Sequence, residues 1–262
     1  MERRPAKLTV FDVDGTLLPD NPDEISGRAF WELNKRGIFT SSDEKLQELW
    51  DLREQYATSP DFERQKYLTP MIIEFDEQMK GRPVKEIKQV AEDLAELDIA
   101  ERLYPAMIEE IGQQREDGTH LAIISGSPDT FIQPLKHRLN FDFATGTRHF
   151  HNRKEYHSTK GVRSRGKEKE HIAKRWCEKI SNELGRQATV SAAYGDTMND
   201  FSLLLEAEDP VAVNPKPALA AEAMRRGWRM IYARDADLEF KLAQPVEKWY
   251  HDKYDLADSH AV

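Results

Sequence analysis

Two aspartates, Asp12 and Asp14, lie two residues apart in the segment 10-VFDVDGTLL-18, directly after an apolar run. Carboxylates usually remain on the protein surface, so a pair that follows a predicted buried strand indicates a functional site. A spacing of two places both side chains on the same side of an extended backbone. Carboxylates held this close repel each other unless a cation neutralises them or one of them stays protonated.

Two further polar clusters follow predicted strands later in the chain. The sequence 125-SGS-127 follows the apolar run 121-LAII-124, and 196-DTMND-200 follows the run 188-ATVSAAYG-195. Parallel strands end at one edge of their sheet, and ligands of such sheets bind beyond the carboxyl ends. We therefore expect these clusters to converge with the first one, although they are far apart in the sequence.

The four aspartates at these strand ends would form a group of like charges: Asp12, Asp14, Asp196 and Asp200. Oxygen ligands alone select a hard ion, and Mg²⁺ is the usual partner of carboxylates and phosphate. The Ser125 hydroxyl and the N–H groups after it could hold phosphate oxygens at a helix N-terminus. A lysine would complete the charge match as a point charge on the phosphate. The pattern therefore predicts a magnesium and phosphate site.

The elements that must position these residues follow from the rest of the sequence. Strands that alternate with helices predict a parallel sheet with right-handed crossovers. The stretch from about Pro22 to Leu103 has helical spacing of apolar residues and several prolines, which predicts an insert of roughly four helices. We therefore predict an α/β fold, with a Rossmann-like core in residues 1–20 and 104–262 and a helical insert in residues 21–103. The expected strands are Lys7–Val13, 121–124, 188–195, 211–214 and 228–233, with two short strands also expected in 141–157.

The polar segments resemble, in order, the motifs of the haloacid dehalogenase (HAD) superfamily of phosphohydrolases. The segment 11-FDVDGTLL-18 resembles its first motif, DxDGT, and Ser125-Gly126 resembles its second. A lysine that opens a later helix resembles the third motif, and 195-GDTMND-200 resembles the fourth, GDxxxD. The resemblance implies a HAD core whose parallel sheet is flanked by helices. The helical insert resembles the C1 cap of subfamily IB, the phosphoserine-phosphatase-like branch, which the segment 211-VAVNPKPALAAEAMRRGW-228 also resembles.

The resemblance implies a catalytic role for each matched residue. Asp12 would attack phosphorus and form an aspartyl-phosphate. Asp14 would protonate the leaving alkoxide and then activate the water that hydrolyses the intermediate. Ser125, the Gly126 N–H group and the lysine would stabilise the phosphate oxygens in the transition state.

The resemblance also implies a metal site. Mg²⁺ would be bound by the Asp12 carboxylate, the Asp14 backbone carbonyl and Asp196. Asn199 and Asp200 would hold the metal ligands and the lysine in position without binding the metal themselves.

Two lysines, Lys167 and Lys169, compete for the third motif. A helix that packs on a sheet must bury an apolar stripe, which falls three, four, seven and eight residues after its first position. From Lys169 these offsets reach apolar residues: Ile172, Ala173, Trp176 and Cys177. From Lys167 they reach polar residues: Glu170, His171, Lys174 and Arg175. The pattern favours Lys169, with Lys167 as the alternative.

The function implied by the resemblance is a Mg²⁺-dependent phosphomonoester hydrolase that acts on a small organic phosphate. The alternatives are phosphoserine phosphatase proper, a phosphotransferase or phosphomutase on the same scaffold, and a regulatory binding protein on an inactive scaffold. Phosphoserine phosphatases carry a glutamate for the substrate amino group and a cap arginine for its carboxylate. This chain has Asn21 at the glutamate spacing and Glu24 three residues later, with Arg64 as the candidate arginine.

Composition limits the other possibilities. The 262 residues carry a formal net charge of −9, which argues against a broad nucleic-acid surface. The single cysteine, Cys177, excludes an internal disulfide framework. No apolar stretch approaches the roughly 18 residues of a membrane span, and the start of the chain lacks a signal-peptide pattern. We therefore expect a cytoplasmic protein that binds a small-molecule phosphomonoester, and neither a nucleic acid nor a membrane.

Two groups of residues near the third motif admit functional and structural interpretations. His149, His151 and His157 have a spacing that zinc could use, but no cysteine is nearby and we favour a solvated hairpin. Four arginines form a basic patch that could attract a phosphorylated substrate, with a solvated loop as an equal alternative: Arg148, Arg153, Arg163 and Arg165.

Overall fold

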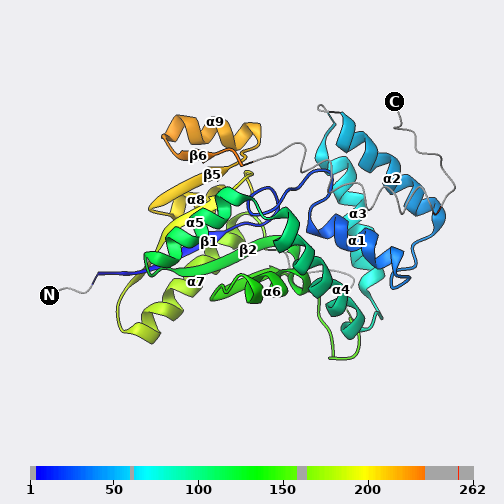
Figure 1. Cartoon of the computed structure of the whole chain (residues 1–262), viewed down its shortest axis with the longest axis horizontal. Helices are drawn as coiled ribbons and strands as arrows, with labels where there is room; N and C mark the ends of the chain where they lie inside the picture. The colour runs from blue at the N-terminus through cyan, green and yellow to red at the C-terminus, as the bar shows by residue number, and fades with distance from the viewer. Residues whose placement is uncertain (1–3, 60–61, 158–163, 234–252, 254–262) are drawn as a thin grey trace.

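The computed structural model describes residues 4–59, 62–157, 164–233 and 253. This part of the chain contains a six-stranded sheet with the order β3-β2-β1-β4-β5-β6, and each neighbouring pair of strands is parallel. The α/β fold with a parallel sheet flanked by helices is thus confirmed (Figure 1). The strands are β1 (Ala6–Phe11), β2 (His120–Pro128), β3 (Phe143–Thr147), β4 (Ala188–Gly195), β5 (Asp209–Val213) and β6 (Arg229–Ile231).

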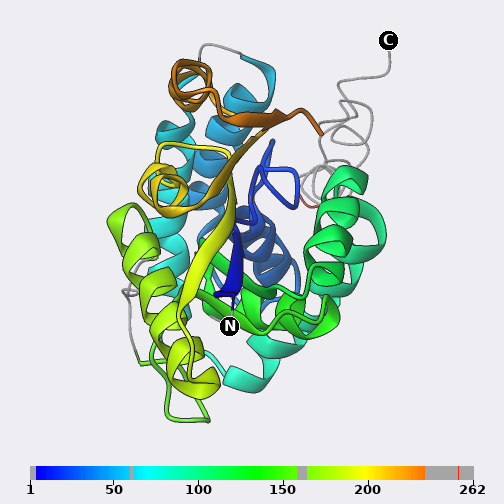
Figure 2. The ribbon, with the colours of Figure 1, turned by 90° about the vertical axis from the view of Figure 1, so that its left-hand side faces the viewer.

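Helices cover both faces of the sheet, as Figure 2 shows. One face packs against α5 (Pro105–Glu116) and α6 (Asp129–Arg138). The other face packs against α7 (Lys167–Leu184), α8 (Phe201–Glu206) and α9 (Pro217–Arg226). Strand β1 is buried on both sides because its side chains alternate: Leu8 and Val10 join one apolar cluster and Phe11 joins the other.

The remaining helices lie between β1 and β2 in the sequence and beyond the carboxyl ends of these strands in space (Figure 1). They are α1 (Ile25–Lys35), α2 (Asp43–Thr58), α3 (Arg64–Met79), α4 (Val84–Leu97) and a π-helical turn, η1 (Asp98–Arg102). Helix α2 begins at Asp43, and the preceding Ser42 hydroxyl caps it by accepting a hydrogen bond from the Lys45 N–H. All of these helices fall within residues 21–103, but the division into a core and a cap stays a prediction.

Residues 141–157 differ from the expected pair of short strands. One strand forms, β3, and the following loop makes isolated bridges between His151 and Tyr156 and between Pro83 and Glu155. The turn at Arg153 has a φ of 78°, and a chain reversal there leaves too few residues for a second strand. None of the described helices has the length and hydropathy needed to span a membrane. The sequence after residue 233 lies outside the described residues apart from Lys253.

Candidate active site

Asp12 leaves the end of β1, where its N–H donates a hydrogen bond to the Tyr194 carbonyl on β4 at 3.0 Å. The chain then turns sharply, because the Gly15 N–H donates to the Leu18 carbonyl at 2.7 Å. Gly15 has a φ of 80°, and a Cβ atom there would collide with the Asp196 carboxylate. Only glycine therefore allows this turn to approach the end of β4 so closely.

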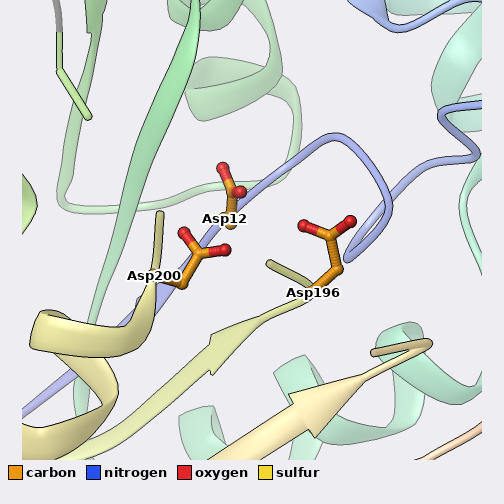
Figure 3. A group of neighbouring side chains, drawn as sticks. All are labelled: Asp12, Asp196 and Asp200. Carbon is orange, nitrogen blue, oxygen red and sulfur yellow. The ribbon is translucent and has the colours of Figure 1, made fainter. Parts of the chain in front are cut away.

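The ends of β1 and β4 bring three aspartates together, Asp12, Asp196 and Asp200. Each offers a carboxylate oxygen, and these oxygens lie within 4.8 Å of one another (Figure 3). All three side chains are buried. Asp196 directly follows β4, and Asp200 precedes α8, so the short loop between them carries both carboxylates to the site.

Lys169 reaches this group from the first turn of α7. Its Nζ atom lies 3.0 Å from Asp12 Oδ1 and 2.5 Å from Asp200 Oδ1. Burial alone would lower the pKa of Lys169, but the negative charges of Asp12 and Asp200 together outweigh this effect. The pKa of Lys169 is therefore above its usual value, and the amine remains charged. The competing Lys167 is exposed. The structure thus brings Lys169 and not Lys167 to the aspartates, as the apolar stripe of the helix suggests.

Asp14 is held beside this group by two hydrogen bonds. Its Oδ1 accepts from the Ile25 N–H at the start of α1, and its Oδ2 accepts from the Ser127 hydroxyl, both at 2.7 Å. Ser125 Oγ lies 3.5 Å from Asp14 Oδ2 and accepts from the Ser127 N–H at 3.0 Å. The matched motifs give no role to Ser127, although its spacing of two from Ser125 on β2 indicates that both side chains lie on the same face of the strand.

Burial and crowding raise the pKa values of the carboxyl groups. Burial, followed by the charge of Asp200, raises the pKa of Asp12 to about 8, although Lys169 opposes the shift. Burial, followed by the charge of Glu24, raises the pKa of Asp14 to about 6. Burial and Asp200 also raise the pKa of Asp196 well above its usual value. The carboxyl groups therefore outnumber the positive charge of Lys169, and without a further cation some of them hold a proton near neutral pH.

The donor set fits a hard divalent cation. Asp196 Oδ2 is buried and has no hydrogen-bond partner among the described residues. Such an atom is costly to bury unless a ligand satisfies it. The neighbouring donors are carboxylate oxygens, with no sulfur or imidazole among them, which is the ligand type of Mg²⁺. The residues present thus suit the predicted metal.

The site opens into a cavity of about 50 Å³. Its walls combine the sheet edge with helical residues from α3 and the preceding loop: Asp12, Asp14, Glu24, Arg64, Gln65, Leu68, Gly126, Ser127, Arg165, Lys169, Asp196, Thr197 and Asn199. Arg64 and Glu24 form an ion pair of 2.7 Å at this wall. The exposed Asn199 lines the cavity, but no described hydrogen bond joins its side chain to the aspartates or to Lys169.

Among the described residues, the three histidines after β3 lie apart from one another's partners and form no metal site. His149 also differs from the expectation that this segment is a solvated hairpin. His149 is buried, with its Nε2 2.8 Å from Asp76 Oδ1 on α3. His151 instead packs edge-on against Tyr156, and His157 is exposed. The loop after β3 places His149 in the interior, where Asp76 on α3 supplies a buried carboxylate.

Two other sequence features have simpler outcomes. Cys177 is buried on the apolar face of α7, and burial raises the pKa of its thiol to about 11, which makes it unreactive. Among the basic residues, Arg148 and Arg153 are exposed, and Arg163 lies outside the described residues. Arg165 lines the cavity.

Comparison with solved structures supports the fold. A protein of unknown function from Bordetella pertussis Tohama I is 20% identical, with a TM-score of 0.69 over 88% of this chain and 100% of that chain. A probable phosphoserine phosphatase from Vibrio cholerae is 19% identical, with a TM-score of 0.54 over 93% of this chain and 68% of that one. A substrate-bound phosphoserine phosphatase is 19% identical, with a TM-score of 0.53 over 92% and 99%.

Comparison of sequences identifies the family. No curated protein matches the chain. Residues 9–205 match the family described as haloacid dehalogenase-like hydrolase, and this range includes the aspartates and serines at the strand ends and Lys169 on α7. The match covers well over half of the chain and confirms the predicted HAD-type hydrolase. The chain belongs to the haloacid dehalogenase-like hydrolase family.

Proposed function

We propose that this hydrolase is a Mg²⁺-dependent phosphatase that cleaves a small organic phosphomonoester through an aspartyl-phosphate. The observation that supports this most directly is the pairing of Asp12 with Lys169 at 3.0 Å in the wall of a cavity of about 50 Å³. By a threshold of roughly 10–15 Å³ per water molecule, the cavity holds a few waters, which is the scale of one phosphoryl group. A nucleophile and a cation therefore meet where a phosphoryl group fits.

Asp12 is the proposed nucleophile. One of its carboxylate oxygens attacks phosphorus, and the bond between phosphorus and the substrate oxygen breaks. Lys169 provides positive charge for the phosphoryl oxygens, together with Ser125 and the Gly126 N–H group. Asp200 holds Lys169 in place from its other side, at 2.5 Å.

Asp14 is the proposed acid and base. The departing alkoxide takes a proton from Asp14, and Asp14 then accepts a proton from the water that attacks the phosphorylated Asp12. The products are the alcohol, inorganic phosphate and the free carboxylate. A pKa of about 6 leaves part of the protein with this proton near neutral pH, as a general acid requires. Ser127 and the Ile25 N–H hold the carboxyl group in one orientation.

The metal-binding residues in this proposal are Asp12 and Asp196 through their carboxylates and Asp14 through its backbone carbonyl. When bound, Mg²⁺ would supply charge neutralisation for the phosphate oxygens and for the crowded carboxylates. Asp200 supports the site through its contact with Lys169, and a supporting role for Asn199 stays a prediction.

Phosphoserine phosphatase proper is a second candidate, favoured by one observation. Glu24 and Arg64 both line the cavity, and they are the residue types that the resemblance assigns to an amino group and a carboxylate. In this structure they form an ion pair with each other, so phosphoserine would have to exchange that pair for its own charges. A small organic phosphomonoester other than phosphoserine is therefore the first proposal.

The test is a Mg²⁺-supplemented panel of metabolite phosphates that includes phosphoserine, ranked by kcat/KM. An added acceptor alcohol separates hydrolysis from the phosphotransferase alternative, because a transferase yields a new phosphomonoester instead of inorganic phosphate. Absence of Mg²⁺-dependent turnover across the panel would contradict the proposal and favour the regulatory binding protein. The cytoplasmic location and the lack of nucleic-acid partners stay predictions.

A further inference from the structure

Arg165 is a cation of the cavity wall that the proposed mechanism does not use. It lies in the short stretch before α7, four residues ahead of Lys169. A Cβ atom on Gly126 would lie 2.9 Å from Arg165 Nε, so the guanidinium packs directly over this glycine. The missing side chain of Gly126 thus makes room for Arg165 beside the proposed phosphate-binding N–H group.

The charges of the other two cations in the wall are balanced by carboxylates. Lys169 contacts Asp12 and Asp200, and Arg64 contacts Glu24 at 2.7 Å. Arg165 has no carboxylate within 4.0 Å among the described residues, and its side chain makes no hydrogen bond there. A positively charged guanidinium that is half-buried favours an anion as its partner.

We propose that Arg165 binds the phosphoryl group of the substrate, together with Gly126 and Lys169; this inference rests on the proposed phosphatase function. The planar guanidinium presents parallel N–H donors that match two phosphate oxygens. Lys169 is also committed to Asp12 and Asp200, so it neutralises only part of a dianionic phosphate. Arg165 supplies the additional positive charge, which becomes most valuable as charge spreads over the equatorial oxygens in the transition state.

The position of Arg165 favours the phosphoryl group over the organic part of the substrate. Arg165 lies over Gly126, on the β2 wall of the cavity, whereas Glu24 and Arg64 are paired at the wall near α3. A cavity of about 50 Å³ leaves little space for a second anionic group next to Arg165. The organic part of the substrate can instead extend into a neighbouring depression of about 410 Å³ that shares Arg64 and Asn199 with the cavity.

The test compares Arg165→Gln and Arg165→Lys with a matched control, Arg148→Gln. The control removes an exposed arginine of the same basic patch. Inorganic phosphate is the probe, both as a competitive inhibitor and in calorimetric titrations with Mg²⁺ present. We expect Arg165→Gln to weaken phosphate binding at least tenfold and to lower kcat/KM by about 10²–10³-fold. The phosphate affinity and kcat/KM of Arg165→Lys should lie between those of the wild type and Arg165→Gln, because lysine keeps the charge and loses the paired donors. Arg148→Gln should change neither quantity by more than about twofold.

Unchanged phosphate binding in a folded Arg165→Gln protein would overturn the proposal, even if the KM of particular substrates rose, because Arg165 would then contact another part of the substrate. If Arg165→Gln fails to fold by circular dichroism, Arg165→Lys decides in the same way: wild-type phosphate affinity overturns the proposal and weaker affinity supports it. Calorimetry needs no turnover. Weaker phosphate binding in a protein that hydrolyses nothing would therefore support Arg165 while contradicting the phosphatase function.

Discussion

Buried carboxylates occur in two regions of this molecule, and the two regions treat them differently. In the helical segment between β1 and β2, three buried aspartates each contact a basic side chain: Asp23 with Arg53, Asp76 with His149, and Asp98 with Arg28 and Arg102. At the carboxyl edge of the sheet, four buried aspartates lie around one buried lysine: Asp12, Asp14, Asp196 and Asp200 around Lys169.

The difference separates structural charges from functional ones. A buried ion pair fixes the position of two elements, and its charges are matched within the chain. The sheet edge leaves negative charge unmatched, which destabilises the free protein and favours a ligand that brings positive charge. Burial first, and neighbouring carboxylates second, raise the pKa values of Asp12 and Asp14, as expected where buried carboxyl groups lack enough positive charge around them.

Asp12→Asn removes a carboxylate from the unmatched group. We expect kcat to fall by at least about 10⁴-fold, because the amide is a poor nucleophile. Thermal stability should stay unchanged or rise, since repulsion with Asp200 and Asp14 is relieved. Steady-state kinetics and thermal unfolding measure the two effects, with the exposed Asp51→Asn as the control. Full activity in Asp12→Asn would remove the proposed nucleophile.

Asp23→Asn breaks a matched pair in the helical segment. It removes the negative charge of Asp23 from its contact with the buried guanidinium of Arg53, and it weakens the hydrogen bond from the Tyr67 hydroxyl. We expect the free energy of unfolding to drop by about 3–5 kcal/mol, measured by urea denaturation. The folded fraction should lose far less activity than Asp12→Asn does. An unchanged denaturation midpoint would show that the pair contributes little to stability.

Mg²⁺ should stabilise the sheet edge selectively. At about 100 times its dissociation constant, the ion should raise the free energy of unfolding by about 2.7 kcal/mol, seen as a higher Tm. Asp196→Asn should abolish this increase, because it removes the buried oxygen that lacks a partner. Asp23→Asn should retain the increase while starting from a lower Tm. Equal increases in both variants would place the ion outside the proposed site.

The metal-free protein should become less stable as the pH rises. The pKa of Asp12 is about 8 in the folded protein and 3.8 in its unperturbed state, so the folded state binds the extra proton between these values. The free energy of unfolding should therefore fall with pH across this window, by about 1.4 kcal/mol per pH unit for each such proton. Asp12→Asn and saturating Mg²⁺ should each flatten the slope between pH 6 and 8. A slope that persists in Asp12→Asn would come from other groups.

Sequence patterns predicted the features that depend on local periodicity. The two-residue spacing of Asp12 and Asp14 and the apolar run before them gave the strand end, and the apolar stripe of α7 distinguished Lys169 from Lys167. The ends of parallel strands meet by a general rule of the fold, so the convergence of Asp12 with Asp196 needed no knowledge of side-chain contacts.

The features that the sequence did not reveal depend on contacts between distant segments. The contact of Ser127 with Asp14 depends on the register between β1 and β2, which the periodicity of each strand does not encode. The burial of His149 depends on Asp76 of α3, in a different part of the chain. Arg165 was one of four similar arginines, and only its packing over Gly126 distinguishes it from the exposed Arg148 and Arg153.

The central place of β1 in the sheet also determines when the site can form during synthesis. Leu8 pairs with His120 on one side, and Ala6 pairs with Ala188 on the other, so β1 is made before both neighbours and gains the second one only after residue 188 has been made. Such non-local pairing slows folding, because the entropy of closing long loops is lost before any stabilising contact forms. The proposed nucleophile, Asp12, is translated well before Lys169, Asp196 and Asp200. A chain that ends before these residues therefore holds the proposed nucleophile without the groups proposed to activate it.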